Sequence, residues 1–158
     1  MIREGGQQDV RFLRDMLRHA YYWRSRDTEF PITRYVNAWG RDGDRALIAL
    51  DDFHEVGAAW YRLYSEREPG FGFVDAETPE LTIGVVPSRR GKGIGSSLLD
   101  ALLEQARGDG FSRISLSVEK TNPAVHLYEN RGFRTAQGDG DLLMVAELGA
   151  QTEEPVSN

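Results

Sequence analysis

The chain has 158 residues, 40% hydrophobic and 28% charged, which is typical of one soluble globular domain. Its net charge of -6 argues against nucleic-acid binding, which needs a basic face. The absence of cysteine excludes disulfides, thiolate metal ligands and a cysteine nucleophile. The three histidines (His19, His54 and His126) are too far apart to predict a metal site. With no apolar signal core and no membrane span of roughly 20 apolar residues, we expect a cytoplasmic protein without a membrane partner.

The first half of the chain predicts helices followed by antiparallel strands. Apolar residues recur at helical spacing over 9–22, where Asp9 is a suitable N-cap. A second short helix is expected over 31–39, with Pro31 near its start. Period and turn signals then predict strands over 45–50, 56–64 and 80–86, with a loop over 65–79 before the last of them.

The second half predicts alternating strands and helices. An apolar stripe from Ile94 to Ala106 predicts a helix that Gly108 and Gly110 end. Asn122 is expected to cap a later helix, with Pro123 in its first position and Gly132 at its end. The strands are expected over 112–118, 133–136 and 142–146, the last two joined by the turn GDGD. We therefore predict one mixed α/β domain over 1–148 and a disordered tail over 149–158.

The stretch RGKGIG at 90–95 lies between an expected strand and an expected helix. Glycine permits a positive φ and close approach of a ligand, and the helix N-terminus offers free N–H groups, so the stretch predicts an anion site. Arg89, Arg90 and Lys92 add positive charge. A Walker A loop fits poorly because its glycine-lysine-serine/threonine ending is missing. A dinucleotide loop fits poorly because Ser96 replaces its third glycine.

Two segments together resemble the GNAT family of N-acetyltransferases. RGKGIG, preceded by the strand LTIGVVP (81–87), is similar to the family's Q/R-x-x-G-x-G/A signature. NPAVHLYENRGF (122–133) resembles its second segment. The resemblance, which covers 80–134, implies a single mixed, mainly antiparallel sheet flanked by helices. It also implies transfer of an acetyl group from acetyl-CoA to a primary amine by direct attack, with no metal.

The resemblance implies which residues bind coenzyme A. Its pyrophosphate is expected on the backbone of Arg90, Gly91, Lys92, Gly93, Ile94, Gly95 and Ser96. The pantetheine arm is expected to pair with the backbone of Val85 and Val86. Asn122 is a further candidate contact, although its capping role alone would explain it.

Two residues are candidate catalysts by the same resemblance. Tyr128 is the candidate general acid beside the thioester sulfur, and the alternative is a tyrosine that only packs in its helix. Glu80 is the candidate general base acting through water, and the alternative is a solvated strand start. As a base, Glu80 would need burial to raise its pKa from about 4.3 toward working pH.

The acceptor side is expected in the first helices and the loop before the central strand. The aromatic candidates are Tyr21, Tyr22, Trp23, Phe30, Tyr35 and Trp39. Trp60 and Tyr61 point to opposite faces of their strand, so at most one contributes. Acidic residues gather in the loop before the central strand and at the start of that strand, namely Glu66, Glu68, Asp75, Glu77 and Glu80. One interpretation is that their field attracts a cationic amine, and the alternative is an ordinary solvated loop.

The sequence leaves the acceptor open among polyamines, antibiotics, amino acids and protein amines. Two other functions are weighed against the enzyme: a catalytically silent CoA-binding sensor or interaction module, and a nucleotide-binding regulator that rests on the glycine stretch alone. Homodimers are common in the resembled family, so a second copy of the chain is one of the partners that the resemblance implies.

Overall fold

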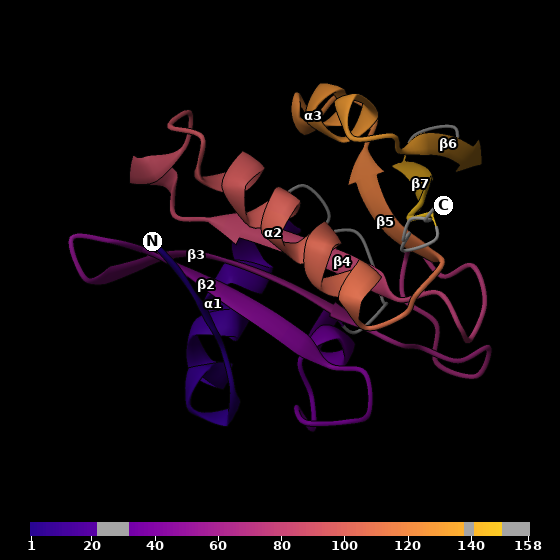
Figure 1. Ribbon diagram of the computed structural model, residues 1–158, viewed down its shortest axis with the longest axis horizontal. Helices are drawn as coiled ribbons and strands as arrows, with labels where there is room; N and C mark the ends of the chain where they lie inside the picture. The colour runs from indigo at the N-terminus through magenta and orange to yellow at the C-terminus, as the bar shows by residue number, and fades with distance from the viewer. Residues whose placement is uncertain (22–31, 138–140, 150–158) are drawn as a thin grey trace, which may run out of the picture. The chain divides into compact units, whose positions relative to one another are not determined.

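The protein is described by a computed structural model that covers residues 1–21, 32–137 and 141–149 (Figure 1). The strands are β1 (Ile2–Glu4), β2 (Arg45–Asp51), β3 (His54–Arg62), β4 (Glu80–Val85), β5 (Arg113–Glu119), β6 (Arg134–Gln137) and β7 (Asp141–Glu147). The α-helices are α1 (Val10–Ala20), α2 (Ile94–Gly108) and α3 (Ala124–Asn130). Short 3₁₀ helices are η1 (Gln7–Asp9), η3 (Ile32–Tyr35) and η4 (Pro87–Arg89).

The strands form a mixed sheet, as predicted. Their hydrogen-bonded order is β1-β2-β3-β4-β5-β7-β6. β4 and β5 pair in parallel, whereas β1–β2, β2–β3, β5–β7 and β6–β7 are antiparallel. The expected strands and helices of the second half all form, within a few residues of their predicted bounds. The chain divides into two compact units, the first with residues 1–62 and 81–102 and the second with 63–80 and the residues from Leu103 onward. The prediction of a single domain over 1–148 stays a prediction.

Three predictions near the N-terminus differ from the structure. β1 was not expected, because three residues are too short to show an alternating pattern; it pairs with β2 through Ile2↔Ala49. The helix expected over 31–39 is only the four-residue η3. Asp9 occupies the N-cap position of α1 as expected, but its side chain makes no capping bond to the helix, because the carboxylate accepts hydrogen bonds from Arg3, at 2.9 and 3.1 Å, and from the Gly6 N–H at 2.9 Å. Pro31, residues 138–140 of the GDGD turn and the tail from 150 lie outside the described residues.

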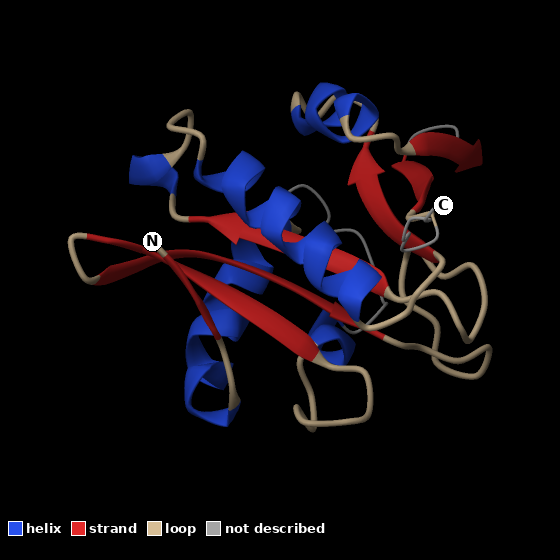
Figure 2. Cartoon of the chain, viewed as in Figure 1, coloured by secondary structure: helices blue, strands red, loops and turns tan. Residues whose placement is uncertain are grey.

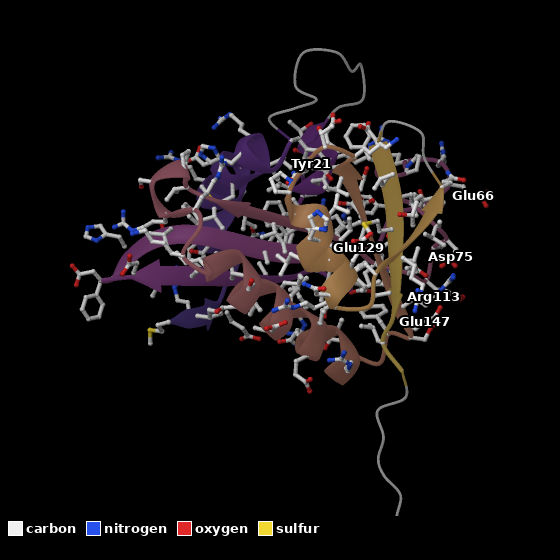
Figure 3. All side chains as sticks on the ribbon, turned by 90° about the horizontal axis from the view of Figure 1, so that it is seen from above. Tyr21, Glu66, Asp75, Arg113, Glu129 and Glu147 are labelled. Atoms are coloured by element: carbon white, nitrogen blue, oxygen red, sulfur yellow. The ribbon has the colours of Figure 1, made fainter. Side chains whose placement is uncertain are left out.

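In the first unit, α1 and α2 cover opposite faces of the sheet β1–β4. A Cβ on Gly57 of β3 would lie 3.2 Å from a methyl of Leu98 in α2. A Cβ on Gly84 of β4 would clash with the carbonyl oxygen of Met16 in α1. Figures 1 and 3, seen at right angles, both show the indigo α1 and the salmon α2 on either side of the strands. Glycine at 84 therefore lets the α1 backbone lie directly against β4.

A buried ion pair joins β3 to the segment between η3 and β2. The Arg62 guanidinium donates to both carboxylate oxygens of Asp44, at 2.9 and 2.8 Å, and neither side chain is more than 2% exposed. Arg62 also lies over the ring of Trp39, 5.3 Å from its centroid. Backbone groups complete the network, namely the carbonyls of Arg34 and Asn37 on Arg62 and the N–H groups of Gly40 and Arg41 on Asp44.

In the second unit, the predicted loop over 65–79 is held against β5. The Ser115 hydroxyl donates to the carbonyl of Gly72 at 2.7 Å. The Arg113 guanidinium donates to Asp75 at 2.6 Å, and Figure 3 labels both side chains. Figure 2 draws this segment as loop, in agreement with the prediction. The loop before β4 thus has a defined conformation although it has no regular secondary structure.

Gly84→Ala is expected to lower the free energy of unfolding by about 1–3 kcal/mol, because the added methyl forces the α1 backbone away from β4. Chemical denaturation measures the change. The matched control is Gly108→Ala in the last turn of α2, where nothing lies within 4 Å of an added Cβ; it should be neutral or slightly stabilising. Equal stability of the two variants would contradict the close packing of α1 on β4.

Candidate functional site

The glycine stretch of the first unit forms an open turn that leads from β4 into α2. Gly91 and Gly93 have φ of +78° and +85°, which side-chain-bearing residues rarely adopt. Nothing lies within 4 Å of a Cβ built on either residue, so the backbone is bare on that side. α2 begins directly afterwards at Ile94, with Gly95 and Ser96 in its first turn. This geometry fits a pyrophosphate held by backbone N–H groups and the helix dipole.

The three basic side chains around the turn have different surroundings. Arg89 donates to Asp51 at 2.8 Å, so its charge is partly compensated. Arg90 donates to the carbonyl of Val85 at 3.1 Å. Lys92 is exposed at the tip of the turn. Burial, and then the positive charge of Arg90, lower the pKa of His19 in α1. Its imidazole is therefore neutral near pH 7.

The backbone at the end of β4 already makes contacts within the chain. The Val86 N–H donates to the carbonyl of Val56 at 2.9 Å, and the Val86 carbonyl accepts from the Arg89 N–H at 3.0 Å. The Val85 carbonyl accepts from the Arg90 side chain. Pairing of the pantetheine arm with Val85 and Val86 stays a prediction, and an arm that used the Val85 carbonyl would share it with the Arg90 guanidinium.

In the second unit, Tyr128 lies near the C-terminal end of α3. Its half-buried ring packs edge-on against Phe133, with 5.7 Å between centroids. Burial raises the pKa of Tyr128 to about 12, so the hydroxyl keeps its proton throughout the physiological pH range. The side chain is therefore a hydrogen-bond donor at working pH. Its packing on Phe133 also agrees with the purely structural alternative.

Asn122 makes the capping bonds predicted for it, although α3 begins at Ala124 and Pro123 holds the N-cap position. Its carboxamide oxygen accepts from the Ala124 N–H at 2.8 Å, and its carbonyl accepts from the Val125 N–H at 3.0 Å. Pro123, which lies between Asn122 and Ala124, has no backbone N–H and therefore needs no hydrogen-bond acceptor. The capping bonds account for Asn122 by themselves, and its contact with CoA stays a prediction.

Glu80 is buried at the start of β4. It is 1% exposed and lies in register with Ser115 of β5. The alternative of a solvated strand start is therefore wrong, because the residue is almost completely buried. Burial disfavours the charged form of a carboxyl, which is the environment that a general base needs. The base role itself stays a prediction.

The aromatic residues expected on the acceptor side are core residues where the structure describes them. Tyr21, Tyr35 and Trp39 are at most 8% exposed, and the rings of Tyr21 and Tyr35 lie 5.1 Å apart. Trp60 donates to the carbonyl of Tyr35 at 3.1 Å, so Trp60 is on the η3 side of β3 and Tyr61 on the other. Tyr22, Trp23 and Phe30 lie outside the described residues.

The acidic run before β4 is only partly a solvated loop. Glu66, Glu68 and Glu77 are exposed. The negative charge of Asp75 is stabilised by its neighbours. Hydrogen bonds from Thr78 and the Glu77 N–H, together with the Arg113 charge, lower the pKa of Asp75. Attraction of a cationic amine by this run stays a prediction, and it rests on fewer free charges than the sequence indicates.

The chain's match to known proteins agrees with this geometry. Residues 10–133 match the model of the Acetyltransferase (GNAT) family. The chain belongs to the GNAT acetyltransferase family. It is 34% identical over 102 residues to a mycothiol acetyltransferase of Brachybacterium faecium, covering 64% of the chain and 29% of that protein. It is 35% identical over 100 residues to an L-methionine sulfoximine/L-methionine sulfone acetyltransferase of Pseudomonas paraeruginosa, covering 63% of the chain and 56% of that protein.

The fold of this GNAT chain is also found among solved structures. A ribosomal-protein-alanine N-acetyltransferase from Brucella melitensis superposes with a TM-score of 0.68 at 25% identity, covering 93% of this chain and 99% of that one. The chain spans less than two thirds of the two curated relatives above. Within the described residues, no cluster of histidine and carboxylate side chains could hold a metal ion. No helix in the same residues has the length and apolar character needed to cross a membrane.

Gly93→Ala is expected to weaken acetyl-CoA binding about tenfold, because alanine resists the positive φ of this turn. Isothermal titration calorimetry measures the Kd. Gly110→Ala is the matched control: Gly110 has φ of +90° and equally open surroundings, in the turn after α2. Both variants should lose similar stability, and only Gly93→Ala should lose affinity. An unchanged Kd for Gly93→Ala would contradict the assignment of the turn to CoA.

Proposed function

We propose that the chain transfers an acetyl group from acetyl-CoA to the primary amine of a small molecule. The observation that supports acetyl-CoA as the donor is the open glycine turn between β4 and α2, with Gly91 and Gly93 at positive φ. The family supplies the reaction class. The names of the two curated relatives, which act on mycothiol and on methionine derivatives, support a small-molecule acceptor. The cytoplasmic location and the homodimer also stay proposals.

The donor side of the proposal rests on backbone groups. Arg90 to Ser96 surround the pyrophosphate with N–H groups of the turn and of the first turn of α2. The Arg90 N–H already donates to the carbonyl of Pro87 at 3.3 Å, so the N–H groups from Gly91 onward are better suited than that of Arg90 to bind the pyrophosphate. Lys92 is the exposed cation suited to a phosphate of the donor. Asn122 and the backbone of Val85 and Val86 complete the proposed CoA contacts.

Tyr128 is proposed as the acid beside the leaving sulfur. A thiol has a pKa of about 8.5, whereas that of Tyr128 is about 12. Complete proton transfer from Tyr128 to the thiolate is therefore unfavourable, and its hydroxyl acts by donating a hydrogen bond to the developing thiolate. The amine attacks the thioester carbonyl, the tetrahedral intermediate expels the thiolate, and no covalent enzyme intermediate forms. Glu80 is the proposed base that takes the proton of the amine through water.

Tyr128→Phe is expected to lower kcat about tenfold to a hundredfold, since a hydrogen-bond donor is lost while the thiolate remains a fair leaving group. Because the pKa of Tyr128 is raised to about 12, its hydroxyl stays protonated as pH rises. The ratio of wild-type to variant kcat should thus be constant between pH 7 and pH 10, measured by thiol release. A variant with wild-type turnover would exclude the acid role, and a ratio that falls through pH 9–10 would exclude the raised pKa.

An amine panel with thiol release as the readout tests the proposed function. The panel contains L-methionine sulfone, L-methionine sulfoximine, spermidine and a peptide with an N-terminal alanine. We expect turnover with a small-molecule amine, and a loss of turnover in Glu80→Gln at the pH where wild type is fastest. Acetyl-CoA binding without thiol release for any amine would favour the silent CoA-binding module. Selective turnover of the peptide would overturn the small-molecule class, and an unaffected Glu80→Gln would exclude Glu80 as base.

A further inference from the structure

The face of the first unit's sheet that α1 and η3 cover holds several buried polar groups. Alternation along the strands places Trp60 and Arg62 of β3 on this face, and Thr82 of β4 shares the face of Gly84, which lies against α1. The Trp60 N–H donates to the carbonyl of Tyr35. Arg62 donates to Asp44 and to backbone carbonyls. Of these three polar side chains, two are thus fully accounted for by contacts within the unit.

Thr82 differs from these neighbours. It is 4% exposed, and within the described part of the chain its hydroxyl oxygen has no hydrogen-bond partner. A buried hydroxyl without a partner destabilises a fold, whereas valine has nearly the same shape and would fill the same space without that penalty. The other face of β4 has the apolar residues Leu81, Ile83 and Val85, so the buried polar side chains of the strand, Glu80 and Thr82, both lie on one face.

We propose that the Thr82 hydroxyl positions the acceptor, accepting a hydrogen bond from the N–H of its primary amine in the loaded enzyme. The inference rests on the proposed function. Alternation places residues 80 and 82 on one face of β4, so the proposed base and this hydroxyl mark the same side of the central strand. A hydroxyl oxygen has two acceptor lone pairs and no charge. It orients an amine nitrogen and leaves the nitrogen lone pair available for attack on the thioester.

The chain offers a matched control for a substitution of Thr82. Thr78 is also buried, at 5% exposure, but its hydroxyl hydrogen-bonds the Asp75 carboxylate. Thr78→Val removes a bond of the folded protein and should lower Tm without changing the KM for the amine. Thr82→Val removes no hydrogen bond among the residues that the structure describes, so its Tm should be unchanged or higher.

The test measures KM and kcat for the panel amine that wild type acetylates best, at saturating acetyl-CoA. We expect Thr82→Val to raise the KM for the amine about tenfold and to leave the KM for acetyl-CoA unchanged. Thr82→Ser, which keeps the hydroxyl, should stay near wild type. If Thr82→Val does not fold, Thr82→Cys replaces it, since a thiol is similar in size and a weak acceptor.

The outcomes separate the two proposals. An active wild type with an unchanged KM for the amine in Thr82→Val would overturn the role of Thr82 alone. An equal rise of that KM in Thr78→Val would overturn it as well, because the effect would then follow from any buried threonine. A wild type that binds acetyl-CoA but acetylates no amine of the panel would overturn the proposed function, and the role of Thr82 with it.

Discussion

The ion pair between Arg62 and Asp44 is the contact on which the first unit most depends. Both charges are buried, and removing one partner of such a pair typically costs about 3–5 kcal/mol, because the other remains charged without compensation. Here backbone groups satisfy the hydrogen-bonding capacity that the two side chains do not use on each other. Backbone carbonyls accept from Arg62, and backbone N–H groups donate to Asp44. The consequence reaches beyond stability, since the same bonds fix η3 and Trp39 over the sheet face that includes Thr82.

The close approach of α1 to β4 fixes the position of the strand that leads into the glycine turn. Gly84 lets the backbone of Met16 contact the strand, so the course of β4 is fixed from one side by α1 and from the other by α2. The strand then delivers the chain to the turn at Gly91 and Gly93, whose surroundings are open. A rigid strand followed by a bare turn suits a loop that must keep one shape for a phosphate. Arg90, bonded to the carbonyl of Val85, ties the turn back to the end of the strand.

The regular elements and the glycine turn follow from local pattern, and the rest follows from contacts between distant residues. The stripe of α2, the alternation of β5 and the glycines at 91 and 93 are local signals, and the structure agrees with each. β1 was missed because three residues carry no period. The N-cap position of Asp9 was predicted correctly, but the bonds of its carboxylate to Arg3 and to the Gly6 N–H were not. The burial of Glu80 depends on tertiary packing, and the sequence alone gives no sign of it; the strand paired with β4 at this residue is reached only at Ser115, 35 residues later. Once β4 is known, the spacing of two residues between Glu80 and Thr82 indicates that both side chains lie on the same face of the strand.

Proton balance indicates which half of the proposed reaction places the greater demand on the protein. A primary amine with a pKa of about 10.4 is almost entirely ammonium at pH 7, and removing its proton costs about 4.6 kcal/mol at about 1.36 kcal/mol per pKa unit. The thiolate, from a thiol with a pKa of about 8.5, needs far less help to leave. Tyr128, with a pKa of about 12, is suited to this lesser task as a hydrogen-bond donor. The larger task falls on the acceptor side, where the structure buries the Glu80 carboxyl and a Thr82 hydroxyl that has no hydrogen-bond partner among the described residues. In the proposed function the glycine turn contacts only the shared donor, so differences in acceptor among proteins with such a turn are expected to arise on that face of β4.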